Sequence, residues 1–196
     1  MFWQKKQSAE EPLMKAVRFF RSLDFFAQDA SLTEQALANK IDSLHKQQWD
    51  SVLDFTDEQA DLNLLKRDDG RVWWEDMEAD VCNENLVYER VLTEWSDISR
   101  GACLPLNIKE DWRSDEGPIE VRFTLNGKQK IVRPTYSDDW LDCSILLAIN
   151  EWITDTGFQF EFPSTFDQTA FIVVLTGDEK RQLIKERGWI FGAAGE

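Results

Sequence analysis

The chain has 196 residues, of which 42% are hydrophobic and 12% aromatic, so it can build one large domain or two small ones, and this composition argues against disorder. Its 22 basic and 37 acidic side chains give a formal net charge of −15, which repels nucleic-acid phosphates and anionic membrane surfaces. The same charge favours cationic partners, although a solvated acidic surface without a specific partner gives the same composition. We therefore expect a basic protein partner, with no nucleic acid and no membrane as partners.

The cysteines and the first residues indicate a cytoplasmic protein. Cys82, Cys103 and Cys143 are widely spaced and form no C-x-x-C pair, which is typical of reduced core residues. The first seven residues lack the apolar segment of a signal peptide, and no apolar run has the length of a membrane span.

Capping-box spacing, a Ser or Thr followed three residues later by Glu or Gln, recurs at 8–11, 31–34 and 56–59. Apolar residues at helical spacing follow each of these signals, so they predict three helices in the first seventy residues. A short strand is expected at 71–74. A further helix is expected after Asn83 or Asn85, ending at Arg100 and Gly101.

Residues 102–117 contain Pro105 and several acids and are predicted to form an irregular connection. Positions 119–125 then alternate between apolar and polar residues, and the Asn126-Gly127 turn follows. The pattern predicts a β-hairpin that returns through 128–133. A strict two-residue loop sets Val121 opposite Val132 and Phe123 opposite Lys130, whereas a bulged loop brings Ile131 toward Phe123.

After the hairpin, Asp139 is placed to cap a helix that ends near Gly157. Positions 158–162 alternate as a strand, and the continuous apolar run 170–175 is typical of a central strand covered on both faces. A fourth capping box, 176–179, opens the last helix.

The predicted fold class is α+β, with a helical N-terminal half packed on a C-terminal ββαββα arrangement that contains a small antiparallel or mixed sheet. We expect residues 1–101 to be mainly helical, 102–117 to be the connection and 118–196 to be the α+β region. The alternative is one continuous domain.

The sequence contains no catalytic motif, so we expect no catalytic residues, no metal site and no cofactor. The single histidine, His45, is expected at the surface or at a helix end. Asp76, Glu78 and Asp80 alternate like the start of a calcium loop, but Val81 and Val87 stand where the loop requires Gly and Glu. A metal-nuclease pattern around 115–122 is equally incomplete, because Arg122 stands where such sites usually have Lys.

Tryptophans that adjoin acidic residues are the remaining candidate site. Indoles bury area at low entropic cost and carboxylates receive Arg or Lys, so this combination suits a basic partner. The alternative is that the tryptophans belong to the core and the acids face water. The candidate partner-binding residues are Trp73, Trp74, Glu75, Asp76, Glu78, Asp80, Trp112, Asp138, Asp139 and Trp140.

These features predict a non-catalytic, acidic protein-binding protein. Its most concrete form is an immunity-type inhibitor of a basic toxin or nuclease, in which the acidic surface mimics the phosphates that such an enzyme binds. The alternatives are a regulatory or adaptor module and a hydrolase that uses clustered carboxylates with a divalent cation.

Overall fold

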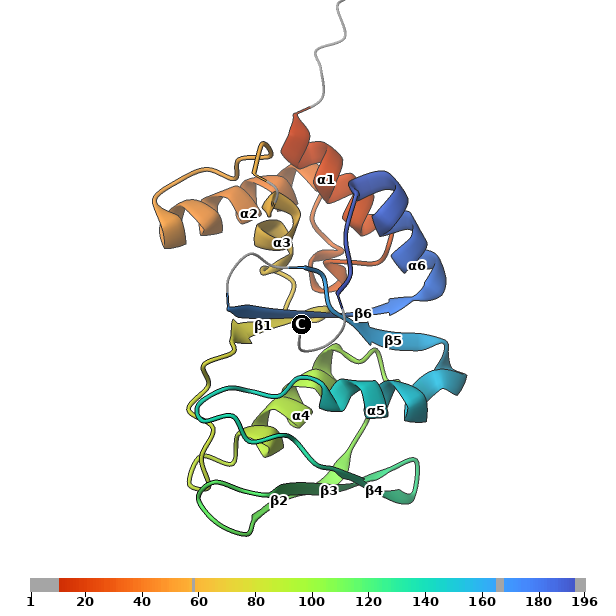
Figure 1. Ribbon diagram of the computed structural model, residues 1–196. Coiled ribbons are helices and arrows are strands. Elements are labelled where there is room, and N and C mark those ends of the chain that lie inside the picture. Colours follow the sequence, from red (N-terminus) through yellow and green to blue (C-terminus); the bar gives the residue numbers. More distant parts are fainter. Residues whose placement is uncertain (1–10, 58, 165–167, 193–196) are drawn as a thin grey trace, which may run out of the picture. The chain divides into compact units, whose positions relative to one another are not determined.

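The computed structural model describes residues 11–57, 59–164 and 168–192 (Figure 1). The chain divides into two compact units, Met1–Asp68 and Asp69–Glu196. This division falls well before the connection expected at 102–117.

The first unit is helical. It contains α1 (Pro12–Arg21), a short 3₁₀ helix (Ala27–Asp29), α2 (Glu34–Trp49) and α3 (Ala60–Leu65). Its core includes fully buried Phe20, Leu37 and Ile41. Asp68 closes the unit, because its carboxylate accepts the backbone N–H of Phe26 at 2.5 Å.

The predicted helices of this unit are present, but their caps differ from the prediction. Thr33 caps α2 by accepting the Ala36 N–H at 3.1 Å, so the box predicted from Ser31 begins two residues early. The box predicted from Thr56 is also wrong, because α3 begins at Ala60 with Gln59 at the N-cap and no side-chain cap. Residues 8–10 of the first predicted box lie outside the described residues.

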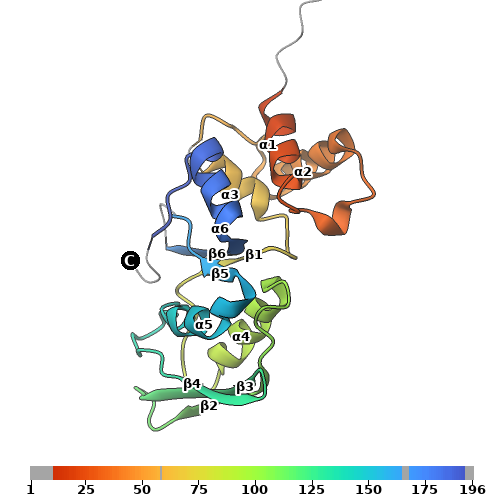
Figure 2. The same ribbon diagram turned by 90° about the vertical axis from the view of Figure 1, so that its right-hand side faces the viewer.

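In the second unit, one antiparallel sheet joins β1 (Val72–Asp76), β5 (Phe158–Glu161) and β6 (Thr169–Thr176) in the order β1-β6-β5. The run 170–175 is buried and central in this sheet, as its apolar sequence predicts. The helix α6 (Gly177–Gln182) follows β6, and the π-helical turn Leu183–Arg187 continues it. Figures 1 and 2 show α6 on one face of the sheet, with α4 and α5 on the other.

A second antiparallel sheet joins β2 (Leu106–Trp112), β3 (Ile119–Leu125) and β4 (Lys128–Val132), with β3 in the centre. The hairpin has the strict register, with Val121 opposite Val132 and Phe123 opposite Lys130. Asn126 and Gly127 have φ values of 51° and 71°, as a two-residue turn of this kind requires. The strand β2 lies within 102–117, so that segment is not the irregular connection predicted for it.

Two helices, α4 (Val87–Ile98) and α5 (Ile145–Ile153), lie between the sheets (Figure 1). They share one hydrophobic core with both sheets, in which Trp95, Phe123 and Ile149 are almost completely buried. Gly157, at φ 77°, ends the 3₁₀ turn Thr154–Thr156 after α5, as predicted. Asp139 does not cap α5, which begins at Ile145 after Ser144.

The α+β class and the ββαββα order of the C-terminal elements are confirmed. The strands form two antiparallel sheets rather than one, because β1 and β2, from earlier in the chain, each pair with part of this segment. Of the helices in the described part of the chain, none combines the length and apolar character needed to cross a bilayer.

Candidate partner-binding face

Two acidic segments that are distant in the sequence pair through their backbones in the second unit. The Leu141 N–H donates to the Met77 carbonyl and the Ala79 N–H donates to the Asp139 carbonyl, both at 2.8 Å. Glu78 and Trp140 form an antiparallel bridge between these bonds. The segment that continues from β1 therefore lies beside the segment before α5.

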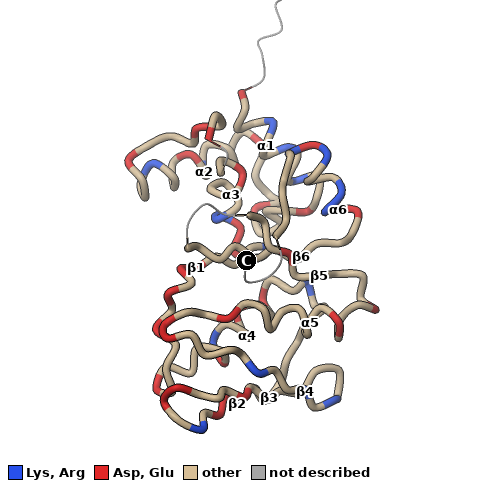
Figure 3. The backbone as a smooth tube through the Cα atoms, viewed as in Figure 1, with Lys and Arg blue, Asp and Glu red and all other residues tan. Residues whose placement is uncertain are grey.

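This pairing gathers six of the ten predicted site residues into what we call the acidic face, consisting of Asp76, Glu78, Asp80, Asp138, Asp139 and Trp140. Its five acidic residues are exposed, and the Trp140 side chain is 38% exposed. Figure 3 shows acidic positions along the chain that leads out of β1. The face therefore combines carboxylates with one accessible indole.

Local hydrogen bonds hold the backbone of the acidic face. The Asp76 carboxylate accepts the Glu78 N–H at 3.0 Å, and Asp80 accepts the Asn85 side-chain amide at 2.7 Å. Asp80 has a φ of 50°, a conformation that Asp tolerates better than most residues. These bonds fix the segment and leave its acidic residues exposed.

An open hollow of about 360 Å³ borders Trp140. Its rim is held by Asp142, whose carboxylate accepts the N–H groups of Thr135 at 2.7 Å and Ser144 at 2.9 Å. The Asp142 N–H in turn donates to the Tyr88 hydroxyl at 3.0 Å. The lining consists of Met77, Thr135, Ser137, Trp140, Leu141, Asp142, Cys143 and Ser144.

The thiol beside this hollow is not suited to nucleophilic catalysis. Burial raises the pKa of Cys143 to about 12, and the nearby Asp142 and Glu75 carboxylates contribute in the same direction. A thiol with such a pKa is protonated at neutral pH, whereas the thiolate is the nucleophilic form. Cys143 and Cys103 are buried, as predicted, whereas Cys82 is half-buried.

Trp112 is half-buried and anchored within the fold. Its indole N–H donates to the Glu110 carboxylate at 2.7 Å, and its ring packs edge-on against Tyr136 with 5.7 Å between the centroids. The pKa of Tyr136 is raised, first by burial and then by the negative charges of Asp138, Glu116 and Asp139. Two of these residues, Asp138 and Asp139, belong to the acidic face.

Trp73, Trp74 and Glu75 are less exposed than the residues of the acidic face. Trp73 is buried, donates to the Glu94 carboxylate at 2.8 Å and packs edge-on against Trp95, so it is a core residue. Trp74 is half-buried, and Glu75 forms an ion pair with Arg90 at 2.9 Å. For Trp73, the alternative that the tryptophans belong to the core describes the structure.

The hydroxyl and carboxylate groups around the hollow, and the contribution of Tyr136, are not indicated by any motif considered above. One available signal was the Asp142-Cys143-Ser144 triplet, because an Asp side chain commonly accepts the backbone N–H two residues later. Thr135 and Tyr136 carry no such signal. Their position depends on the tertiary path of the segment that follows β4.

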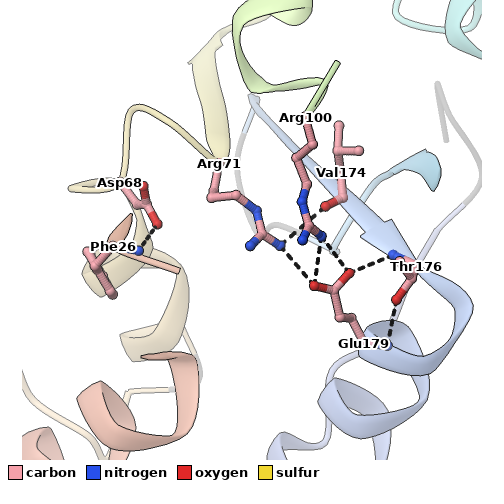
Figure 4. A network of polar contacts seen from close by, with 7 residues as sticks. All are labelled: Phe26, Asp68, Arg71, Arg100, Val174, Thr176 and Glu179. Carbon is pink, nitrogen blue, oxygen red and sulfur yellow. Dashed lines mark hydrogen bonds and ion pairs between the residues drawn. The ribbon is translucent and has the colours of Figure 1, made fainter. Parts of the chain in front are cut away.

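Figure 4 shows a second cluster of charged side chains, whose members bind one another within the fold. The Glu179 carboxylate accepts bonds from Arg100 at 2.8 and 2.9 Å, from Arg71 at 3.4 Å and from the Thr176 N–H at 2.7 Å. The Thr176 hydroxyl accepts the Glu179 N–H, which completes the predicted capping box of α6. This cluster fastens elements of the second unit together.

Glu120 and Arg122 of the incomplete metal-nuclease pattern also form ion pairs within the fold. Arg122 forms ion pairs with Asp111 and Glu120, and Arg133 adds a bond to Glu120 at 2.7 Å. These side chains form an ion-pair ladder on the β2-β3-β4 sheet. No group of three or more His, Cys, Asp or Glu side chains in the described ranges is arranged to hold a metal ion.

His45 lies four residues before the end of α2 and is buried, so the surface alternative expected for it is wrong. Burial and the nearby Arg67 lower its pKa, while Asp42 acts in the opposite direction. Its Nε2 atom lies 3.4 Å from the Ser51 hydroxyl oxygen. Cys82, Cys103 and Cys143 all belong to the second unit, so the histidine has no cysteine within its own unit.

No family model, curated protein or solved structure matches this chain in the comparisons with known proteins.

Proposed function

We propose that this chain is a non-catalytic binding protein whose acidic face receives a basic surface of a protein partner. The most concrete form is an immunity-type inhibitor of a basic toxin or nuclease. The observation that supports this proposal is the backbone pairing of 77–79 with 139–141, which sets two acidic segments around the exposed Trp140.

The chemistry of the acidic face suits guanidinium and ammonium groups. Carboxylates form charge-assisted hydrogen bonds with Arg and Lys, and an exposed indole adds a cation–π surface and a rigid anchor. A nuclease active site presents cationic groups to bind phosphates, so a fixed row of carboxylates can occupy the same groups. The net charge of −15 accelerates encounter with such a partner.

The alternative of a carboxylate-dependent hydrolase needs paired carboxyl groups with raised pKa values that are open to substrate. Burial raises the pKa of Glu110, against the opposing effect of its hydrogen bonds. However, its oxygens accept the Trp112 indole N–H and the Tyr88 N–H, at 2.7 and 2.8 Å. Both oxygens of Glu110 are therefore engaged in hydrogen bonds within the fold.

The two compact units favour the adaptor alternative instead, since each unit offers a surface of its own.

Affinity capture at low and high salt tests the proposal, with purified basic candidates from the same cell and its secreted fraction used to measure Kd. We expect a basic partner that binds more weakly as salt rises. Trp140→Ala should weaken binding at least about tenfold, as for an interface anchor. Trp49→Ala is the matched control, because Trp49 is also exposed but lies in the other unit.

The charge contribution has its own pair of variants. Asp138→Asn with Asp139→Asn should slow association and flatten the salt dependence. The exposed pair Asp69→Asn with Asp155→Asn changes the net charge equally and should have a smaller effect. If both double variants and Trp140→Ala bound the partner as tightly as the wild type does, this result would contradict the proposed face. Turnover of a substrate by the chain would support the hydrolase alternative.

A further inference from the structure

A groove of about 490 Å³ lies within the first unit, away from the sequence positions of the acidic face. Its lining comes from a stripe along α2, from the segment 52–56 and from the start of α1. The α2 stripe consists of Gln35, Ala38, Asn39, Asp42 and Lys46, and Glu11, Pro12 and Leu13 come from the start of α1.

The groove has an apolar surface that the described residues leave partly open. Leu13 and Ala38 are buried beneath it, Leu53 and Phe55 are half-buried, and Val52 is 57% exposed. An exposed branched side chain beside a hollow of this size provides apolar area that a partner can bury.

The rim of the groove carries excess negative charge. Glu11, Asp42 and Asp54 line it, and Lys46, the one cation among the described lining residues, is paired with Asp42 at 2.6 Å. The backbone N–H and the hydroxyl of Thr56 donate to Asp54 at 2.9 and 2.8 Å, which lowers the pKa of Asp54 and keeps it ionised. A second copy of this chain would bring another net charge of −15, so electrostatic repulsion disfavours it as the occupant.

The length of the groove indicates what shape fits it. The α2 stripe from Gln35 to Lys46 extends about 16 Å at 1.5 Å per residue, which is roughly three helical turns. We propose that this groove binds a basic amphipathic helix of about three turns from a protein partner. The apolar face of that helix packs on Val52 and Phe55, and its Lys or Arg side chains pair with Glu11 and Asp54. This inference does not depend on the proposed role of the acidic face.

The test uses the full ¹⁵N-labelled chain and a 14-residue synthetic helix with Leu on one face and Lys on the other, followed by amide shifts in NMR spectra. We expect the shifts to change at the α2 stripe and at 52–56. Val52→Asp should weaken this binding at least tenfold, and Glu11→Gln should weaken it a few-fold. Ile190→Asp is the matched control, because Ile190 is also an exposed branched residue (72%) but belongs to the second unit.

Three outcomes would overturn the inference. One is a set of shift changes confined to the acidic face, with Val52→Asp binding like the wild type. Another is equal binding of a helix with Glu in place of Lys. A third is a shift at the groove that grows with protein concentration when no peptide is present, which would identify a second copy as the occupant. Loss of the acidic-face partner would leave all these readouts unchanged, so the two proposals fail separately.

Discussion

Glu179 is the residue on which the polar architecture of the second unit most depends. Its side chain is 11% exposed, and those of Arg71 and Arg100 are 5% and 22% exposed. Arg71 precedes β1, Arg100 follows α4 and Glu179 lies in α6, so one carboxylate connects three parts of the chain. Removing one partner of a buried ion pair leaves the other charge uncompensated.

Glu179→Gln is therefore expected to lower the free energy of unfolding by about 3 kcal/mol at pH 7. Urea denaturation of the wild type and the variant measures this difference. Glu186→Gln is the control, because Glu186 is paired with Lys185 at the surface and should contribute little. A Glu179→Gln variant as stable as the control would show that the cluster does not stabilise the unit.

The difference in stability between the wild type and Glu179→Gln should depend on pH. Burial alone would raise the pKa of Glu179, but the Thr176 N–H, Arg100 and Arg71 together hold it below its ordinary value of 4.5. A carboxyl whose pKa is depressed by folding contributes its full stability above its unfolded pKa. That contribution is lost as the pH falls through the lower folded value. The gap between wild type and Glu179→Gln should therefore shrink below about pH 4.5, and a constant gap down to pH 3 would contradict the assignment.

Residue-scale patterns were predictable only where their partners are close in sequence. The Thr176–Glu179 capping box spans three residues and is confirmed. The two arginines that bind the same carboxylate are 79 and 108 positions away, and no local pattern indicates them. The burial of His45 was missed for a similar reason, since a single polar residue on a helix does not reveal what packs over it.

At the scale of elements, the hairpin turn offers a test of backbone conformation. Gly127 has a φ of 71°, and a Cβ at this position would meet nothing within 4 Å. Gly127→Ala should therefore destabilise the protein through backbone strain alone, by about 1 kcal/mol. Gly177→Ala is the matched comparison, since Gly177 opens α6 without a positive φ and the nearest neighbour of its Cβ is the flexible Arg181 side chain.

We expect Gly177→Ala to be stabilising by about 0.5 kcal/mol, because it reduces the freedom of the unfolded chain. Thermal unfolding of both variants measures the two effects. Opposite signs for the same chemical change would support the turn geometry. A loss at both positions would show that packing rather than backbone conformation controls these sites.

Elements with a strong local pattern were predicted and those with a weak pattern were not. The alternation in β3 and the apolar run of β6 follow directly from burial on one face and on both faces. The strand β2 was missed because Leu106–Trp112 is an edge strand, mostly half-exposed or exposed, and its pairing shifts between Leu106 and Lys109. For the candidate site, the acidic segments were predicted, but their pairing depends on tertiary register.

At the scale of the whole molecule, the second unit has the parts of an independent folding domain. Both sheets, α4, α5, α6 and the shared core all lie within Asp69–Glu196. A chain of residues 69–196 should therefore fold alone. Its ¹H–¹⁵N spectrum should match most of the corresponding signals of the full protein, and it should unfold cooperatively on heating.

A shorter chain beginning at Met77 provides the comparison. It lacks β1 and Arg71, so β6 loses one neighbour and Glu179 loses one arginine. We expect this chain to be poorly dispersed in the same spectrum. If residues 69–196 behaved in the same way, the division after Asp68 would not mark a folding boundary.

The strand order of the β1-β6-β5 sheet also affects how the chain leaves the ribosome. Among the strands of the described residues, its central strand β6 is the last to be synthesised and its edge strand β1 is the first. The β2-β3-β4 sheet can pair as soon as β4 has emerged. Until β6 has been synthesised, Val72 and Trp73 lie on a strand whose hydrogen-bonding neighbour has not yet been made. A nascent chain stalled between β4 and β6 therefore exposes an aggregation-prone strand beside a finished sheet, and translation through β6 ends that exposure.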